Sequence, residues 1–210
     1  MDGMKSELVE YCKTMYATGL VSSSGGNVSV RCEGTALITP TGRSLRNLRP
    51  EEIVEIDIAS GRVIGEGKPS KEATMHLAAY RSRDDVRAVV HVHSPCAVSL
   101  SCLKDLVDGE DAMPAYTPGY AARIGRLLVV PYLRPGSSEL AKEVAGFLRS
   151  HDAVLLRNHG TLGVGRDLDS ALNIVEDIEA NARIHITLGG TGRALCEDER
   201  RSLFRREGGA

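Results

Sequence analysis

Short stretches with the hydrophobic spacing of β-strands alternate along this chain with longer stretches that have the spacing of α-helices. Residues 6–20 predict the first helix, because Leu8, Val9, Cys12 and Met15 fall on one apolar stripe. The same spacing predicts three further helices, over residues 70–81, 137–150 and 167–188. Ser94-Pro95 indicates another helix start, with Ser94 as N-cap and proline at the first helical position.

Clusters of β-branched and aliphatic residues between turn signals predict the strands. The most apolar cluster, VRAVVHVH at residues 86–93, is expected to be a buried strand. Residues 104–120 show no period and are expected to be irregular. Other strands are predicted at 28–31, 35–39, 53–58, 62–64, 127–132 and 153–157, with a short one after the turn at 158–160. This alternation of strands and helices predicts a mixed α/β fold.

Length and composition are those of one globular domain. A chain of 210 residues fits a single core, since domains usually span about 100–200 residues. Apolar residues make up 42% of the chain and charged residues 26%, which is ordinary for such a domain. Residues 1–190 are expected to form the domain, followed by a charged, loosely held tail over 191–210.

The composition argues against polyanionic partners. A formal net charge of −2 gives no general attraction to nucleic acid or to an anionic membrane. With no Trp and two Phe, the chain also has few rings on which nucleic-acid bases could stack. An anionic substrate would therefore have to be bound by a local site.

The cysteines and the N-terminal segment indicate the cytoplasm. Five Cys is an odd number and no C-x-x-C motif occurs, which fits reduced thiols better than a disulfide framework. The first ten residues, MDGMKSELVE, lack the apolar region of a signal peptide. No apolar run reaches the roughly 20 residues that cross a bilayer, so no membrane contact is expected.

Three histidines, His91, His93 and His159, are the candidate metal ligands. Residues two apart on a strand point to the same face, so the imidazoles of His91 and His93 project together. A metal ion removes their mutual repulsion by binding both in the neutral form. His159 lies in a predicted strand–turn–strand where Gly160 lets the backbone turn beside the ring. Three His with one open position is the pattern of a catalytic zinc site.

Each histidine also has a plainer interpretation. An H-x-H pair on a strand is often a polar patch or a hydrogen-bonded pair without metal. His76 lies on an apolar helix face, which is typical of a core histidine or of one that supports a metal ligand. The patterns around His151 and His185 indicate surface or helix-face positions, and no role is predicted for them.

The segment KPSKE at residues 68–72 begins the second predicted helix, with Ser70 as its expected N-cap. Glu72 in the first turn either complements the helix dipole or acts as a general acid/base near the metal. The free N–H groups at the helix start favour an anion site. The loops at 25–27 and 39–42 offer more hydrogen-bond donors, although such loops are usually plain turns. No Walker or dinucleotide motif occurs, which argues against ATP and NAD.

Five segments together resemble the class II aldolase/adducin family, which includes fuculose-phosphate aldolase and ribulose-phosphate 4-epimerase. They follow the family order over most of the first 165 residues. The segments KPSKE, SPCAVSLSCL, YTPGYAARIG and PYLRPGSSELA are most similar to a branch that includes 3-oxo-tetronate 4-phosphate decarboxylases. The five family segments are SGGNVSVR (24–31), ITPTG (38–42), KPSKEATMH (68–76), AVVHVHS (88–94) and NHG (158–160).

The resemblance implies an α/β/α sandwich around a mainly antiparallel sheet. It also implies a homotetramer with active sites between subunits. One zinc ion per subunit would lie on His91, His93 and His159, with Glu72 as the acid/base.

The resemblance further implies a phosphate site and a catalytic tyrosine. Lys71 stands where the aldolases often carry a second serine, which adds a charge to the site. Tyr132 lies near the position of the aldolases' catalytic tyrosine, with Tyr116 and Tyr120 as rivals. The implied phosphate ligands are Gly26, Asn27, Thr41, Gly42 and Ser70, joined by Lys71.

These residues predict a zinc-dependent carbon–carbon lyase that cleaves a small phosphorylated ketose or 3-oxo sugar acid, giving dihydroxyacetone phosphate or a similar product. Bond breaking beside a ketone leaves an electron pair on carbon, which zinc would hold as an enediolate by acting as a Lewis acid. Aldol cleavage, decarboxylation and 4-epimerisation share this logic and stay open. A non-catalytic adducin-like module and a structural zinc protein are the alternatives outside catalysis.

Overall fold

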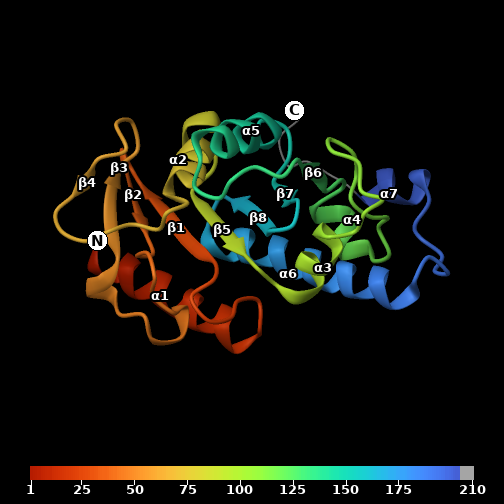
Figure 1. The fold of residues 1–210 in the computed structure, drawn as a ribbon, viewed down its shortest axis with the longest axis horizontal. Coiled ribbons are helices and arrows are strands. Elements are labelled where there is room, and N and C mark those ends of the chain that lie inside the picture. The colour runs from red at the N-terminus through yellow and green to blue at the C-terminus, as the bar shows by residue number, and fades with distance from the viewer. Residues whose placement is uncertain (204–210) are drawn as a thin grey trace.

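The computed structural model describes residues 1–203, and residues 204–210 of the predicted tail lie outside that range. Eight strands form one sheet in the order β4-β3-β2-β1-β5-β8-β7-β6 (Figure 1). All neighbouring strands are antiparallel except β6 and β7, which are parallel. The strands are β1 (Asn27–Cys32), β2 (Thr35–Ile38), β3 (Val54–Asp57), β4 (Val63–Ile64), β5 (Ala88–Val92), β6 (Leu128–Val130), β7 (Ala153–Leu156) and β8 (Gly160–Gly165).

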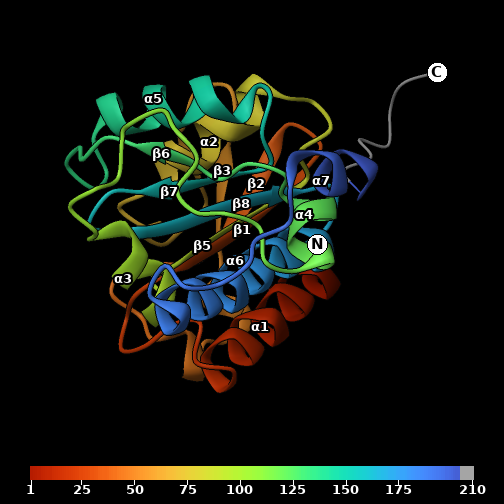
Figure 2. The same cartoon turned by 90° about the vertical axis from the view of Figure 1, so that its right-hand side faces the viewer.

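Helices cover both faces of this sheet. Figure 2 shows α2 and α5 on one side of the strands and α1 and α6 on the other. The α/β/α sandwich predicted from the family resemblance is therefore confirmed. None of the helices in residues 1–203 is both long and apolar enough to span a membrane. The helices are α1 (Asp2–Ala17), α2 (Ala73–Ser82), α3 (Pro95–Ser101), α4 (Pro118–Arg123), α5 (Ser138–Leu148), α6 (Leu168–Leu188) and α7 (Glu197–Leu203), with short 3₁₀ turns η1 (Leu45–Asn47) and η2 (Pro50–Glu52).

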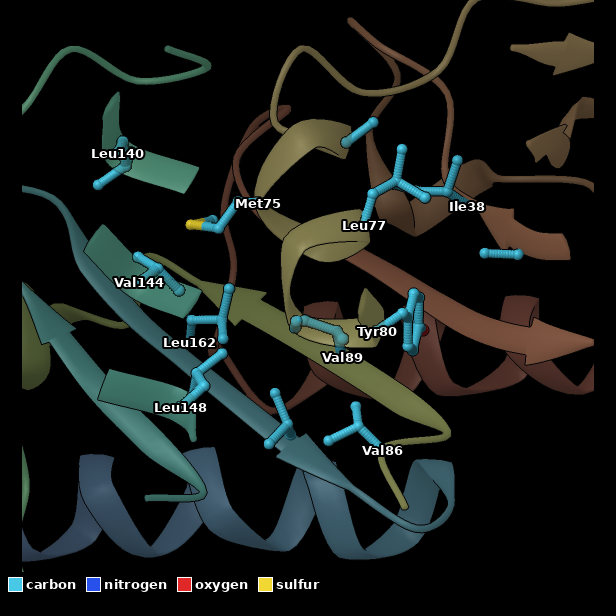
Figure 3. Packing of buried hydrophobic residues seen from close by; sticks show 14 of the residues in the cluster. Ile38, Met75, Leu77, Tyr80, Val86, Val89, Leu140, Val144, Leu148 and Leu162 are labelled. Carbon is cyan, nitrogen blue, oxygen red and sulfur yellow. The ribbon is translucent and has the colours of Figure 1, made fainter. Parts of the chain in front are cut away.

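The core has two layers because successive strand residues point to opposite faces. On β5, Val89 packs with the α2 and α5 layer, whereas Val90 packs with the α1 and α6 layer. Figure 3 shows the first layer, where Met75 and Val144 meet Leu162 of β8. Every residue of β5 is buried, so this central strand is held from both sides.

The helix starts differ from the sequence prediction in two places. The first helix begins at Asp2, ahead of the predicted residue 6. Its first turn has no buried residue and so adds nothing to the apolar period from which the start was predicted. The second begins at Ala73 with Glu72 as N-cap, which corrects the prediction of Ser70. Ser70 forms a turn ahead of the helix, since its carbonyl accepts from the Ala73 N–H at 3.1 Å and its hydroxyl from the Glu72 N–H at 3.2 Å.

Two further helices were not predicted. The segment expected to be irregular contains the start of α4, where the Thr117 hydroxyl accepts from the Tyr120 N–H and a proline occupies the first turn. Part of the expected tail forms α7, whose Arg200 pairs with Asp111 at 3.2 Å, while Leu203 packs against the core. The domain boundary at residue 190 stays a prediction.

Gly163 of β8 lies directly beneath α6. A Cβ atom there would lie 2.9 Å from Cγ2 of Ile174 and 3.0 Å from Cγ1 of Val175. We expect Gly163→Ala to force α6 off the sheet and lower the free energy of unfolding by about 1–3 kcal/mol, measured by urea denaturation. The control Gly146→Ala, inside α5 with open space around it, should instead raise stability by about 0.5–1 kcal/mol. Equal changes in both variants would contradict this account of the packing.

Candidate metal centre and the loops around it

The centre begins at β5, which places His91 on the α2 face of the sheet. His91 has the same strand parity as Val89 and is fully buried, with 0% exposure. Its Nδ1 lies 2.8 Å from the carbonyl oxygen of Thr161 on β8. Because a carbonyl only accepts, Nδ1 carries a proton, and Nε2 is the nitrogen that faces the cluster.

The other two predicted ligands converge on His91. Nε2 of His93 lies 2.9 Å from Nε2 of His91, and Nε2 of His159 lies 3.3 Å from the same atom. The three ring centroids are 4.7–4.9 Å apart. The structure therefore confirms that imidazoles separated by 66–68 residues along the chain meet at one point.

Two glycines allow this approach. A Cβ atom at Gly160 would clash with the carbonyl oxygen of Val92 and lie 3.1 Å from Cδ2 of His93. A Cβ atom at Gly25 would lie 2.9 Å from Nδ1 of His93. The turn before β8 also holds Asn158 in the left-handed region at φ 53°, which points the next side chain back to the centre.

Glu72 completes the cluster from the start of α2. Its Oε2 lies 3.2 Å from Nε2 of His91, and its Oε1 lies 3.3 Å from Nε2 of His159. One donor atom from each of the four residues lies within 4.8 Å of the others. Burial by itself would raise the pKa of this carboxyl, but His91, His159 and the Asn27 amide hold it well below its usual range.

The donor set fits a divalent cation. Burial lowers the pKa of His93 to about 3 and that of His159 to about 4, so both rings are neutral at pH 7. Oε1 of Glu72 is buried and has no hydrogen-bond donor in the described chain. Neutral imidazole nitrogens and an ionised carboxylate are the ligands that zinc accepts. The four residues therefore form a cluster that suits a divalent metal ion.

Three loops predicted to bind phosphate lie beside Glu72. The Thr41 N–H donates to the Lys68 carbonyl at 3.0 Å, and the Ser70 N–H donates to the Thr39 carbonyl at 3.0 Å, which joins the second loop to the third. Thr39 in turn donates from its N–H to Val28 of β1 at 3.0 Å. Glycines in the left-handed region, Gly26 and Gly42, form the turns of the first two loops.

Asn27 and Lys71 stand apart from the other predicted phosphate ligands. The Asn27 amide is 4% exposed and contacts Glu72 and His76, which occupies its oxygen and one N–H. Lys71 is exposed, and its backbone lies against Gly136 in the loop before α5. The phosphate roles of both residues stay predictions.

The three candidate tyrosines have different surroundings. Tyr132 is 60% exposed, and Tyr120 is fully buried in an apolar cluster formed with residues of α3, α4 and α6. The Tyr116 hydroxyl lies 3.1 Å from Nδ1 of His185. Within residues 1–203, no hydrogen bond joins any of these tyrosines to the His and Glu cluster.

Residues behind Glu72 were only partly predicted. His76 was placed either in the core or in support of a ligand, but Ser29 and Tyr80, which contact it or each other, were not singled out. A signal was present, since residues 72, 76 and 80 recur every four positions along one helix face. Sequence periodicity alone could not show that β1 faces them with polar side chains.

Residues 6–186 match the family model described as the Class II Aldolase and Adducin N-terminal domain. The chain belongs to the class II aldolase and adducin family. A 3-oxo-tetronate 4-phosphate decarboxylase of Haemophilus influenzae is 38% identical over 204 residues, which are 96% of each protein. An L-fuculose phosphate aldolase of Methanocaldococcus jannaschii is 35% identical over 180 residues, covering 86% of this chain and 94% of the relative.

Solved structures agree with this family membership. YgbL from Escherichia coli, for which aldolase, epimerase and decarboxylase are named as alternatives, superposes with a TM-score of 0.92 at 33% identity. The match covers 97% of this chain and 99% of that structure. An L-fuculose 1-phosphate aldolase has a TM-score of 0.85 at 35% identity, with 95% and 93% covered. This class II aldolase-family chain is thus an enzyme of the lyase type.

Acid should destabilise the metal-free enzyme through its buried imidazoles. The pKa values of about 3 for His93 and about 4 for His159 lie below that of an imidazole in the unfolded chain, about 6.5. Below pH 6.5 the unfolded chain therefore binds more protons, and stability falls by up to about 1.4 kcal/mol per pH unit for each group. Guanidinium unfolding between about pH 7 and pH 5 measures the decline. The double variant His93→Gln/His159→Gln should show a flatter dependence, and an unchanged slope would contradict the assignment.

Proposed function

We propose that this enzyme is a zinc-dependent carbon–carbon lyase acting on a small phosphorylated ketose or 3-oxo sugar acid. The observation that carries the proposal is the meeting of three imidazoles and a carboxylate at one buried point, beside the three loops described above. The names of the relatives, which include 3-oxo-tetronate 4-phosphate decarboxylases and L-fuculose phosphate aldolases, support both the reaction class and the substrate class. Decarboxylation and aldol cleavage are its two principal forms.

The metal would be held by His91, His93 and His159, one ion in each subunit. When bound, zinc supplies Lewis-acid stabilisation of the negative charge that develops on the substrate oxygen next to the breaking bond. The hydrogen bond from His91 Nδ1 to the Thr161 carbonyl orients that ring so that Nε2 would face the metal.

The loops beside Glu72 would bind the phosphate and so orient the reacting end of the substrate. Ser70 offers its hydroxyl from a turn that precedes the N-terminus of α2, the end of a helix that favours an anion. The exposed Lys71 adds a positive charge that a second serine would not supply. The proposed phosphate ligands are Gly26, Asn27, Thr41, Gly42, Ser70 and Lys71.

Glu72 would move the proton. Its pKa lies well below the usual range of a carboxyl, so it begins the cycle as a base. In aldol cleavage a base accepts the proton of the substrate hydroxyl as the aldehyde leaves. In decarboxylation, Glu72 or a tyrosine returns a proton to the carbon that loses CO₂.

A homotetramer with shared active sites accounts for the position of Tyr132. Its ring is 60% exposed, and within residues 1–203 it makes no hydrogen bond to the cluster of its own chain. A tyrosine in this position could serve the centre of a neighbouring subunit, which is our proposal for its catalytic role. All five cysteines are free, which supports the proposed cytoplasmic location.

Replacing a ligand tests the metal proposal. We expect His91→Ala to lose bound zinc and reduce turnover at least about 10³-fold, because the remaining groups cannot stabilise the developing charge. Elemental analysis and steady-state kinetics measure the two losses, and circular dichroism checks the fold. The control His151→Ala, at the loop between α5 and β7, should keep both metal and activity. A metal-free His91→Ala enzyme with full activity would refute the proposal.

A product screen separates the reaction forms. Phosphorylated ketoses and 3-oxo sugar acids would be supplied one at a time, with dihydroxyacetone phosphate and CO₂ followed separately. Both products together indicate decarboxylation, and dihydroxyacetone phosphate without CO₂ indicates aldol cleavage. An isomeric sugar phosphate with neither product would favour a 4-epimerase. A zinc-free protein that converts nothing would favour a non-catalytic adducin-like module.

A further inference from the structure

Behind Glu72, the polar faces of β1 and α2 run side by side. Four helix residues rise about 6 Å, and two strand residues advance about 6.6 Å. Positions 72, 76 and 80 of the helix therefore have nearly the same spacing as positions 27, 29 and 31 of the strand. This match of spacings lets one polar side chain from each element meet the next across the interface.

The side chains join in one unbranched series of hydrogen bonds. The Tyr80 hydroxyl lies 2.7 Å from Oγ of Ser29, which lies 2.7 Å from Nδ1 of His76. Nε2 of His76 lies 2.5 Å from Oδ1 of Asn27, and Nδ2 of Asn27 lies 2.9 Å from Oε2 of Glu72. Each of the five residues is at most 7% exposed, so water does not compete for these bonds.

The Asn27 amide determines the direction of every bond. Its Nδ2 donates to Oε2 of Glu72, and its oxygen faces Nε2 of His76. An amide oxygen only accepts, so the proton of the neutral His76 ring sits on Nε2. Nδ1 must then accept from Ser29, and the Ser29 oxygen must accept from the Tyr80 hydroxyl.

We propose that Tyr80, Ser29, His76 and Asn27 form a hydrogen-bond chain of single polarity that ends on Glu72, and that His76 is a positioning residue acting on Glu72 through Asn27. Burial lowers the pKa of His76 to about 3, which agrees with a neutral ring. The role of Glu72 in this proposal rests on the lyase function proposed above.

The far end of the chain is held independently of the metal centre. The Arg31 guanidinium lies 5.1 Å from the centre of the Tyr80 ring and donates to the Tyr80 carbonyl. These two contacts orient Tyr80 without relying on the hydrogen bond between its hydroxyl and Ser29. Hydrogen bonds aligned in one direction polarise one another, which strengthens the last bond to the carboxylate.

At the near end, the chain uses only one oxygen of Glu72. The Asn27 N–H takes Oε2, while Oε1 has no hydrogen-bond donor in the described residues and faces His159. The carboxylate is thus held through Oε2, and Oε1 remains available to the reaction. Asn27 accordingly holds Glu72 with one amide N–H, and only its second amide N–H remains to donate to phosphate.

The tautomer of His76 tests the polarity directly. Long-range ¹H–¹⁵N correlation spectra of the metal-free and zinc-loaded enzyme should show a proton on Nε2 and none on Nδ1. A proton on Nδ1 would reverse the chain and overturn the proposal. This readout needs no substrate, so it decides the polarity even if the proposed lyase function fails.

Kinetics test the positioning role. His76→Leu should lower kcat by about 10–100-fold while the KM and the bound zinc stay near wild type. His76→Gln, which keeps a donor and an acceptor, should restore most of the lost kcat. Loss of thermal stability alone, or equal loss of kcat in both variants, would reduce His76 to a structural residue and overturn the role.

A milder pair of variants guards against misfolding. Tyr80→Phe removes only the first donor of the chain and should lower kcat about five-fold, the size of one neutral hydrogen bond. Tyr11→Phe removes a hydroxyl that donates to Asp169 between α1 and α6, outside the chain, and should leave kcat unchanged. Equal kcat values for the two variants would contradict the proposal.

Discussion

The structure depends on the crowding of three imidazoles and a carboxylate at one buried point. Imidazole nitrogens lie 2.9 and 3.3 Å apart, with carboxylate oxygens 3.2 and 3.3 Å from them, so the nitrogens repel one another and a buried charge has to be compensated. A divalent cation on the imidazoles would remove the repulsion and offset the charge of the neighbouring carboxylate. The fold must therefore hold His91, His93, His159 and Glu72 firmly enough that their repulsion does not disperse them.

The central strand supplies that firmness. β5 is buried on both faces and flanked by β1 and β8, so the backbone that carries His91 cannot shift without disturbing both core layers. The neighbouring β8 adds the Thr161 carbonyl that orients the His91 ring, and Gly160 permits its close approach. Packing energy from the whole sheet thus maintains a local arrangement that is unfavourable without metal.

The buried cluster and the groups around it have different roles in the proposed chemistry. Aldol cleavage, decarboxylation and epimerisation all develop negative charge next to a carbonyl, so the same metal centre and the same support of Glu72 suit each of them. Discrimination between substrates must then come from groups farther out. The exposed Lys71 and the tyrosine at position 132 are placed where such differences can arise without disturbing the buried ligands.

The amino-acid sequence determined most of the element types, the H-x-H pair and the candidate residues of the site, because periodicity and side-chain chemistry are local properties. It missed α4 and α7 and misplaced the start of α2, since helix caps and short helices depend on contacts such as that of Arg200 with Asp111. Only the tertiary structure brought His159 to the strand pair and turned Asn27 toward Glu72. Those contacts join residues that are 45 and 68 positions apart in the chain, and contacts between such distant positions follow from packing rather than from any local pattern.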